Sequence, residues 1–201
     1  MGKILILNGS PRAPHSNSKR YAGLFTKHCP VECTYANLTK RNHAELRSRM
    51  DDCSDLLLVF PLYADALPVG LLNFLKFLEA NPPVRKPVVS VLINCGFLEY
   101  RQNETAVRMV RLFCRQNGYE FGSVLMLGGG EAILDTPFRF VAARKIRKLA
   151  RAVAAGRRIE LHATMPVTKR MFIWASTRYW VGYGAKFGVT KEQMQTPEIE
   201  S

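Results

Sequence analysis

Small polar side chains and one arginine follow the first apolar segment of the chain. Residues 4–7 are Ile or Leu, and the loop from Gly9 to Ser18 then combines serine, asparagine and histidine side chains with Arg12. A helix N-terminus attracts anions through its free N–H groups and its dipole, and an arginine can add two parallel hydrogen bonds. The same serines and asparagines are also ordinary helix caps. Because the loop directly follows a predicted buried strand, we favour a phosphate site, although the glycine spacing of a P-loop or a Rossmann fingerprint is missing.

Three further loops with residues suited to ligand binding follow later apolar segments. Residues 61–68 carry Tyr63 and Asp65 between two prolines, residues 94–99 begin with Asn-Cys-Gly-Phe, and residues 128–131 read Gly-Gly-Gly-Glu. We interpret Asp65 as a cap of its loop or of the following helix rather than as a base. Tyr63 and Phe97 have two open interpretations, contact with a ligand ring or packing in the core.

The spacing of the apolar segments predicts five β/α units. Short apolar runs, typical of strands buried on both faces, alternate with segments of helical periodicity. This alternation indicates an α/β fold with a doubly wound parallel sheet of order 2-1-3-4-5, whose ligand crevice lies at the carboxyl ends of the first and third strands. The predicted strands are residues 3–8, 31–36, 55–60, 87–94 and 121–127, and the predicted helices are residues 18–28, 43–53, 69–79, 102–117 and 138–155.

The loops at these strand ends, in this order, resemble those of the flavodoxin-like NAD(P)H-dependent FMN reductases and quinone reductases over residues 1–155. The matching segments are Asn-Gly-Ser-Pro-Arg with a following Ser-Asn-Ser, residues 61–79, residues 94–103 and residues 128–131. The resemblance implies a flavodoxin-like fold and bound FMN. It implies that the FMN phosphate is held by Ser10, Arg12, Ser16, Asn17 and Ser18, that one border of the flavin ring is formed by Pro61, Leu62, Tyr63, Ala64 and Asp65, and that its other edge is closed by Asn94, Cys95, Gly96 and Phe97.

The same resemblance implies an FMN-dependent oxidoreductase. Hydride would pass from NADH or NADPH through FMN to a quinone, a free flavin or another small acceptor, and no catalytic side chain is needed because hydride transfer is the chemistry of the cofactor. Two alternatives remain, an electron carrier without its own NAD(P)H oxidation and a non-enzymatic flavin-binding module. Iron–sulfur flavoproteins carry a cysteine-rich insertion in the loop after the third strand, and this loop lacks it. The five cysteines of the chain also do not form a complete set of metal ligands, so we expect no metal.

The charge balance is strongly basic. Lys and Arg total 29 against 16 Asp and Glu, which gives a formal net charge of +13. Such a surface attracts phosphorylated ligands, acidic proteins, nucleic acid or anionic lipid. No nucleic-acid-binding module is recognisable, so we expect no nucleic-acid partner. Small electron-carrier flavodoxins are typically acidic, and the basic charge therefore favours the reductase alternative.

The chain is predicted to contain an FMN-binding domain, residues 1–158, and a C-terminal extension of aromatic and basic residues, 159–201. For the extension we favour packing across a dimer or over the flavin site, and we rank attachment to a membrane lower, because glycines and Arg178 interrupt the apolar pattern. The segment 69–79 is apolar around most of a helix, which predicts a homodimer through that helix. An odd number of cysteines and no recognisable secretory leader predict a cytoplasmic protein.

Overall fold

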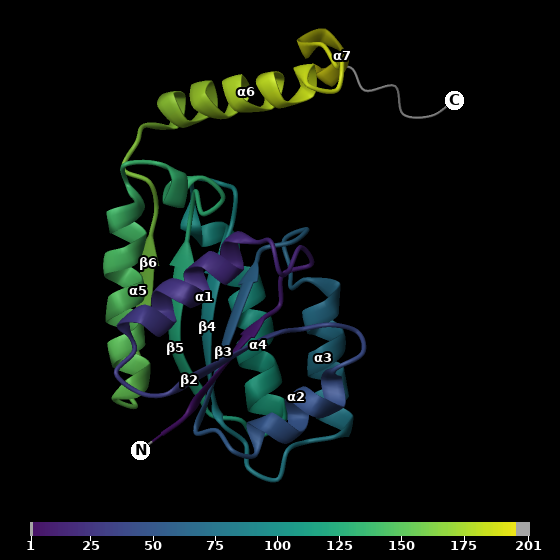
Figure 1. Ribbon diagram of the computed structural model, residues 1–201, viewed down its shortest axis with the longest axis vertical. Coiled ribbons are helices and arrows are strands. Elements are labelled where there is room, and N and C mark those ends of the chain that lie inside the picture. The colour runs from purple at the N-terminus through teal and green to yellow at the C-terminus, as the bar shows by residue number, and fades with distance from the viewer. Residues whose placement is uncertain (1, 196–201) are drawn as a thin grey trace. The chain divides into compact units, whose positions relative to one another are not determined.

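The computed structural model describes residues 2–195 and divides the chain into two compact units, with the boundary between Met165 and Pro166. The first unit is a parallel sheet with helices on both faces (Figure 1). Its strands are β1 (Ile4–Asn8), β2 (Cys33–Asn37), β3 (Asp55–Pro61), β4 (Val88–Asn94), β5 (Phe121–Leu127) and β6 (Glu160–Ala163). Its helices are α1 (Asn17–His28), α2 (His43–Met50), α3 (Val69–Ala80), α4 (Glu104–Gln116) and α5 (Arg139–Ala154), with 3-10 turns η1 (Tyr100–Asn103) and η2 (Ile133–Asp135).

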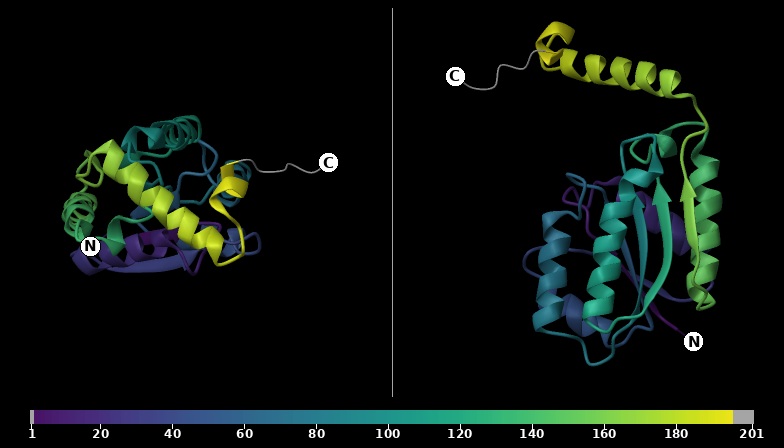
Figure 2. Two further views of the ribbon diagram at one scale, coloured as in Figure 1. Left: turned by 90° about the horizontal axis from the view of Figure 1, so that it is seen from above. Right: turned by 180° about the vertical axis from the view of Figure 1, so that it is seen from behind.

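The central strands are buried on both faces. Residues 4–7 of β1 are all buried, and alternate residues face opposite layers of helices. Leu5 and Leu7 belong to the cluster formed with α2, α3 and α4, whereas α1 and α5 pack together on the other face (Figure 2). This two-sided burial explains the continuous apolar runs in the sequence.

The predicted strand count was wrong, because the sheet has six strands. The order is β2-β1-β3-β4-β5-β6, so the predicted order of the first five strands is found and a sixth is added beside β5. The added strand pairs in parallel with β5, from Val124 opposite Glu160 to Leu127 opposite Ala163. It spans four residues, of which only Leu161 and Ala163 are buried. A short edge strand buried on one face has no continuous apolar run, which is why the sequence pattern did not reveal it.

Helix α3 packs most of its apolar residues within its own chain. Leu71, Phe74, Leu75 and Leu78 are buried, and the ring of His43 from α2 lies 5.3 Å from that of Phe74. The exposed apolar side chain at the start of this helix is Val69. The structure therefore removes the reason for which the sequence predicts a dimer through this helix. The homodimer itself stays a prediction.

The second unit contains α6 (Lys169–Ala185) and α7 (Lys191–Gln195). The Thr168 hydroxyl caps α6 by accepting a hydrogen bond from the N–H of Met171. Gly184 allows the two helices to approach closely, because a Cβ there would lie 2.9 Å from Met194 Sδ. Within residues 2–195, no helix is both long and apolar enough to cross a membrane.

Candidate functional site

The loops at the carboxyl ends of β1, β3, β4 and β5 enclose a cavity of about 390 Å³. It lies at the predicted place, where the chain order of the sheet reverses between β1 and β3. Of the predicted site residues, it is lined by Ser10, Arg12, Ser16, Asn17, Ser18, Pro61, Leu62, Tyr63, Asn94, Cys95 and Gly96. Pro11 and Glu131 also line it, whereas Ala64, Asp65 and Phe97 do not.

Asn8, the last residue of β1, holds the first loop in shape. Its side chain is fully buried, and its Oδ1 accepts a hydrogen bond of 3.0 Å from the N–H of Ser10. Its Nδ2 donates to Ser16 Oγ at 3.2 Å and to the Tyr35 hydroxyl at 2.9 Å. One amide side chain thus connects both ends of the loop to β2. The sequence shows Asn8 only as the end of a strand, so this positioning residue was missed.

Helix α1 begins at the wall of the cavity. Ser16 has an extended backbone, and its Oγ accepts a hydrogen bond of 3.2 Å from the N–H of Lys19. The first N–H groups of a helix have no partner within the helix, so those of Asn17 and Ser18 remain for another acceptor. Capping and anion binding are therefore compatible in this loop, because the cap uses only one of the free donors.

Charged side chains join the first loop to the segment after β5. Arg12 forms an ion pair with Glu131, with 3.1 Å between Nη2 and Oε1, and both side chains are substantially exposed. Asn17 Nδ2 donates a hydrogen bond of 2.8 Å to the carbonyl oxygen of Glu131. In α1, Arg20 donates two hydrogen bonds, of 2.9 and 2.6 Å, to Asp135, and these bonds hold the pKa of that carboxyl below its usual value. Glu131 was noticed in the glycine-rich loop but not predicted as a site residue.

Gly130, in the segment after β5, lies close against Asn94 and Tyr21. A Cβ at this position would lie 2.7 Å from Asn94 Cβ and 3.3 Å from the Tyr21 hydroxyl oxygen. The Tyr21 hydroxyl donates a hydrogen bond of 2.5 Å to the Gly130 carbonyl. Asn94 is buried, and its Nδ2 donates to the carbonyl of Phe60 at 3.2 Å. The absence of a side chain at Gly130 therefore lets α1, the end of β4 and the segment after β5 pack together beneath the cavity.

The loop after β3 turns sharply beside the cavity. Tyr63 and Ala66 exchange two backbone hydrogen bonds, of 3.1 and 3.0 Å, around Ala64 and Asp65, whose φ angles are +46° and +57°. Two successive positive φ angles are typical of a type I′ turn, a conformation that costs energy for alanine. Helix α3 begins after Pro68 without a side-chain cap, so the interpretation of Asp65 as a helix cap was wrong.

Two aromatic side chains near this end of the sheet are exposed. Tyr63 is 59% exposed and Phe97 is 54% exposed, which excludes the interpretation that they pack in the core. Tyr63 lines the cavity, whereas Phe97 accepts, through its carbonyl, a backbone hydrogen bond from Gly129. Both rings are thus free to meet a ligand, and Tyr63 is the one already placed on the cavity wall.

Cys95 is a buried thiol at the end of β4. Asn103 Nδ2 lies 3.4 Å from its sulfur, and burial raises the pKa of the thiol to about 11. A thiol with such a pKa remains protonated near neutral pH and is a poor nucleophile. Cys95 therefore contributes shape to the cavity rather than covalent chemistry. Among the described residues, no group of three or more His, Cys, Asp and Glu side chains is arranged to hold a metal ion.

Comparison with known proteins relates the first unit to flavodoxin-like structures. No family model matches the chain, and no curated protein sequence matches it. An FMN-dependent NADH-azoreductase from Bacillus anthracis, solved in complex with FMN, aligns with a TM-score of 0.58 and 13% identity over 77% of this chain and 100% of its own. An NAD(P)H:quinone oxidoreductase from Methanothermobacter marburgensis aligns with a TM-score of 0.57 and 17% identity, over 76% of this chain and 96% of its own.

A flavodoxin from Streptococcus pneumonia aligns with a TM-score of 0.56 and 13% identity, over 76% of this chain and 98% of its own. The three structures thus include reductases as well as a flavodoxin. Because the sequence identities are below 20%, the similarity to these structures is a similarity of fold. The chain has a flavodoxin-like α/β fold, extended by a C-terminal helical unit.

Proposed function

We propose that the protein is an FMN-dependent oxidoreductase that takes hydride from NADH or NADPH and passes electrons to a quinone, a free flavin or another small acceptor. The observation that carries the proposal is the cavity at the β1/β3 reversal, into which the N-terminus of α1 and the loops after three further strands converge. Its volume of about 390 Å³ lies within the range of small-molecule sites.

The donor set at one end of the cavity suits a phosphate. Hydroxyls of Ser10, Ser16 and Ser18 and the amide of Asn17 line it beside the start of α1. Free N–H groups and the positive end of a helix dipole favour an anion, and Arg12 adds a positive charge at the rim. These residues would hold the phosphate of FMN.

The other end of the cavity suits the flavin ring. Pro61, Leu62 and Tyr63 present apolar and aromatic surface, and Gly96 leaves room beside the end of β4. When bound, FMN supplies the hydride-transfer chemistry, and the protein supplies position and electrostatics. The turn at Ala64 and Asp65 fixes the backbone of Tyr63 through its two hydrogen bonds with Ala66. The chain's own residues would thus orient the ring and leave one of its faces accessible to substrates.

A spectroscopic and kinetic experiment tests the proposal. The purified protein should carry or take up FMN, identified by its visible absorption and by chromatography of the released chromophore. Anaerobic addition of NADH or NADPH should bleach that absorption. A single open face that serves both substrates in turn predicts parallel double-reciprocal plots, as in a ping-pong cycle. Bleaching by a protein reductase, but by neither nucleotide, would instead support the electron-carrier alternative.

Arg12 and Glu131 should affect FMN binding in opposite directions. Arg12→Ala removes a charge-assisted hydrogen bond to the phosphate and should weaken binding by about 1.5–3 kcal/mol, or roughly 10- to 150-fold in Kd. Glu131→Gln removes a carboxylate from the same rim, frees Arg12 from its ion pair and should strengthen binding. Both affinities can be measured by fluorescence titration of FMN.

A matched control lies on α4. Arg108 forms an ion pair with Glu104 at 3.3 Å, and its side chain is 75% exposed, compared with 77% for Arg12. Arg108→Ala should leave the FMN affinity unchanged. Equal affinities for the Arg12 and Arg108 variants would place the phosphate elsewhere.

A further inference from the structure

Helix α6 carries a row of aromatic rings along one side, which we call the aromatic stripe. The stripe consists of Phe172, Tyr179, Trp180, Tyr183 and Phe187, the last of which lies two residues after the end of the helix. Positions 7, 8, 11 and 15 residues after the first lie on the same side of an α-helix. Ring contacts confirm the alignment, with centroids 5.9 Å apart for Trp180 and Tyr183 and 5.2 Å apart for Tyr183 and Phe187.

Four of the five rings of the stripe are exposed, and Phe172 is half-buried. Tyr179 is 63%, Trp180 46%, Tyr183 45% and Phe187 69% exposed, and none of the residues of α6 is buried. Contiguous exposed apolar surface of this kind marks a site of interaction with a protein or a membrane. Its composition is specific, because Trp and Tyr combine an apolar ring with a polar tip, as residues at membrane interfaces do.

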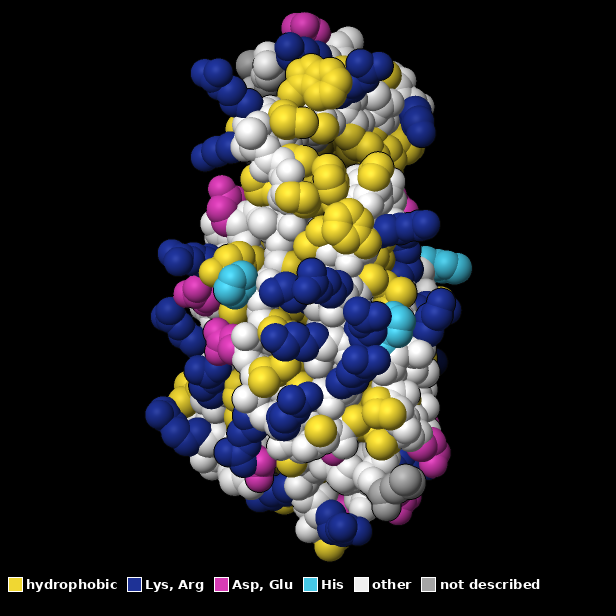
Figure 3. Space-filling view, turned by 90° about the vertical axis from the view of Figure 1, so that its left-hand side faces the viewer, with side chains coloured by type: hydrophobic (Ala, Val, Ile, Leu, Met, Phe, Trp, Pro, Cys, Tyr) yellow, Lys and Arg dark blue, Asp and Glu magenta, His cyan; other side chains and the backbone are white. Residues whose placement is uncertain are grey.

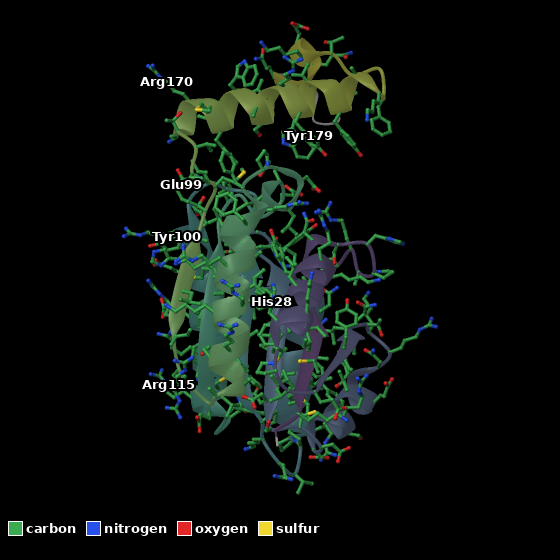
Figure 4. The ribbon with its side chains drawn as sticks, turned by 60° about the vertical axis from the view of Figure 1, so that its left-hand side comes forward. His28, Glu99, Tyr100, Arg115, Arg170 and Tyr179 are labelled. Atoms are coloured by element: carbon green, nitrogen blue, oxygen red, sulfur yellow. The ribbon has the colours of Figure 1, made fainter. Side chains whose placement is uncertain are left out.

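The side chains around the stripe are positively charged, and this charge indicates the kind of partner. Residues 161–191 contain no Asp or Glu, whereas they include Lys169, Arg170, Arg178, Lys186 and Lys191. Arg170 and Tyr179 leave α6 on different sides, so the helix has cationic side chains away from the stripe as well (Figure 4). The first carboxylate after this stretch is Glu192. A counterpart with negative charge is therefore required.

These charges disfavour pairing of α6 with a second copy of itself. Two copies of the segment 161–191 would bring ten cations together along a stretch without a carboxylate. Like charges that face each other oppose association. An anionic lipid surface has the complementary charge, and its boundary between headgroups and acyl chains accepts rings that are apolar at one end and polar at the other.

We propose that α6 is a membrane-surface helix that lies on anionic lipid, with the aromatic stripe at the level of the acyl chains and the flanking Lys and Arg side chains among the headgroups. Long cationic side chains can cover apolar surface while their charges reach the headgroups. The helix would lie in the plane of the interface and would not cross the bilayer. This proposal is independent of the bound cofactor.

Basic side chains of the first unit add long-range electrostatic attraction to an anionic membrane. Helix α5 exposes basic side chains on the side of that unit shown in Figure 3, where dark blue Lys and Arg groups gather. The exposed ones are Arg139, Arg144, Arg147, Lys148 and Arg151. Together with the net charge of +13, they attract the whole chain toward an anionic surface without defining how it docks.

The chain contains its own reporter for the test, because one of its two tryptophans, Trp180, belongs to the stripe, whereas Trp174 lies on the opposite side of α6. The full-length protein would be mixed with vesicles of phosphatidylcholine alone or with about a third phosphatidylglycerol. We expect a blue shift of tryptophan emission and co-sedimentation at least tenfold stronger with the anionic vesicles. A rise from about 0.1 to 0.5 M salt should weaken the binding, because it screens the charges.

Paired variants distinguish lipid binding by the stripe from nonspecific adsorption of other exposed apolar or charged side chains. Tyr179→Ser combined with Phe187→Ser keeps both tryptophans and should weaken binding to anionic vesicles at least tenfold. The control combines Val84→Ser with Leu112→Ser, which removes two exposed apolar side chains from the first unit and should have no effect. Arg178→Gln with Lys186→Gln should also weaken binding, whereas Lys76→Gln with Arg115→Gln changes the net charge equally and should weaken it less.

Three results would overturn the proposal. The first is equal binding to neutral and anionic vesicles. The second is unchanged vesicle binding in the stripe variant, which would assign the lipid contact to the basic face of the first unit. The third is a doubled mass in light scattering without lipid that is abolished by the stripe variant, because it would show that the stripe pairs with a second copy of the chain.

Discussion

Replacing Asn8 with alanine should lower the free energy of unfolding by about 3 kcal/mol and remove most FMN binding. The fully buried Asn8 side chain accepts from the N–H of Ser10 and donates to Ser16 and to the Tyr35 hydroxyl. Each buried polar group that loses its partner costs about 1–3 kcal/mol. Urea unfolding measures the stability, and titration with FMN measures the loss of the preformed loop.

The matched control for Asn8 is Asn73, which lies exposed on α3. Asn73→Ala should change the stability by less than about 0.5 kcal/mol, as surface substitutions usually do, and leave FMN affinity unchanged. The role assigned to Asn8 would be contradicted by a folded Asn8→Ala protein whose FMN affinity stays within threefold of the parent.

Adding one methyl group at Gly130 and at Gly23 should change stability in opposite directions. At Gly130, the new Cβ would lie 2.7 Å from Asn94 Cβ, so buried backbone must move, at a cost of about 1–3 kcal/mol. The same shift would disturb the hydrogen bond from Tyr21 to the Gly130 carbonyl. Gly23 lies within α1, and a Cβ there would point into open space, so alanine should stabilise the helix by about 0.5–1 kcal/mol.

Unfolding midpoints and FMN titrations of the two alanine variants measure both effects. Gly130→Ala should also weaken FMN binding, because Gly130 adjoins Asn94 on the cavity floor, while Gly23→Ala should not. A Gly130→Ala protein as stable as its parent would show that the segment after β5 adapts without strain.

The sequence could predict most of the site because the site lies at strand ends. A strand buried on both faces, such as β1, leaves an unbroken apolar run, and the polar residues that follow it mark the carboxyl edge of the sheet. The loops containing Ser16, Tyr63 and Asn94 were therefore assigned to one edge from their order along the chain, and all three residues line the same cavity.

Other features escaped the sequence because local patterns do not encode them. The strand β6 is short and buried on one face, so its residues resemble an irregular extension. The aromatic stripe of α6 is interrupted in the sequence by Arg178 and glycines, yet the rings align once the helix is formed. In β6 the alternation of buried and exposed residues is too short to distinguish from a loop. In α6 the helical spacing of the apolar residues is interrupted by charged residues and glycines.

The sequence by itself determined the order of the first five strands and the loops that could bind a ligand, because burial and turn chemistry act over a few neighbouring residues. Only the tertiary structure decided that Glu131 pairs with Arg12, that Tyr21 reaches Gly130 and that Asn8 holds the first loop. The first two contacts join residues more than 100 positions apart. Such contacts depend on how the layers pack, and no spacing along the chain specifies them.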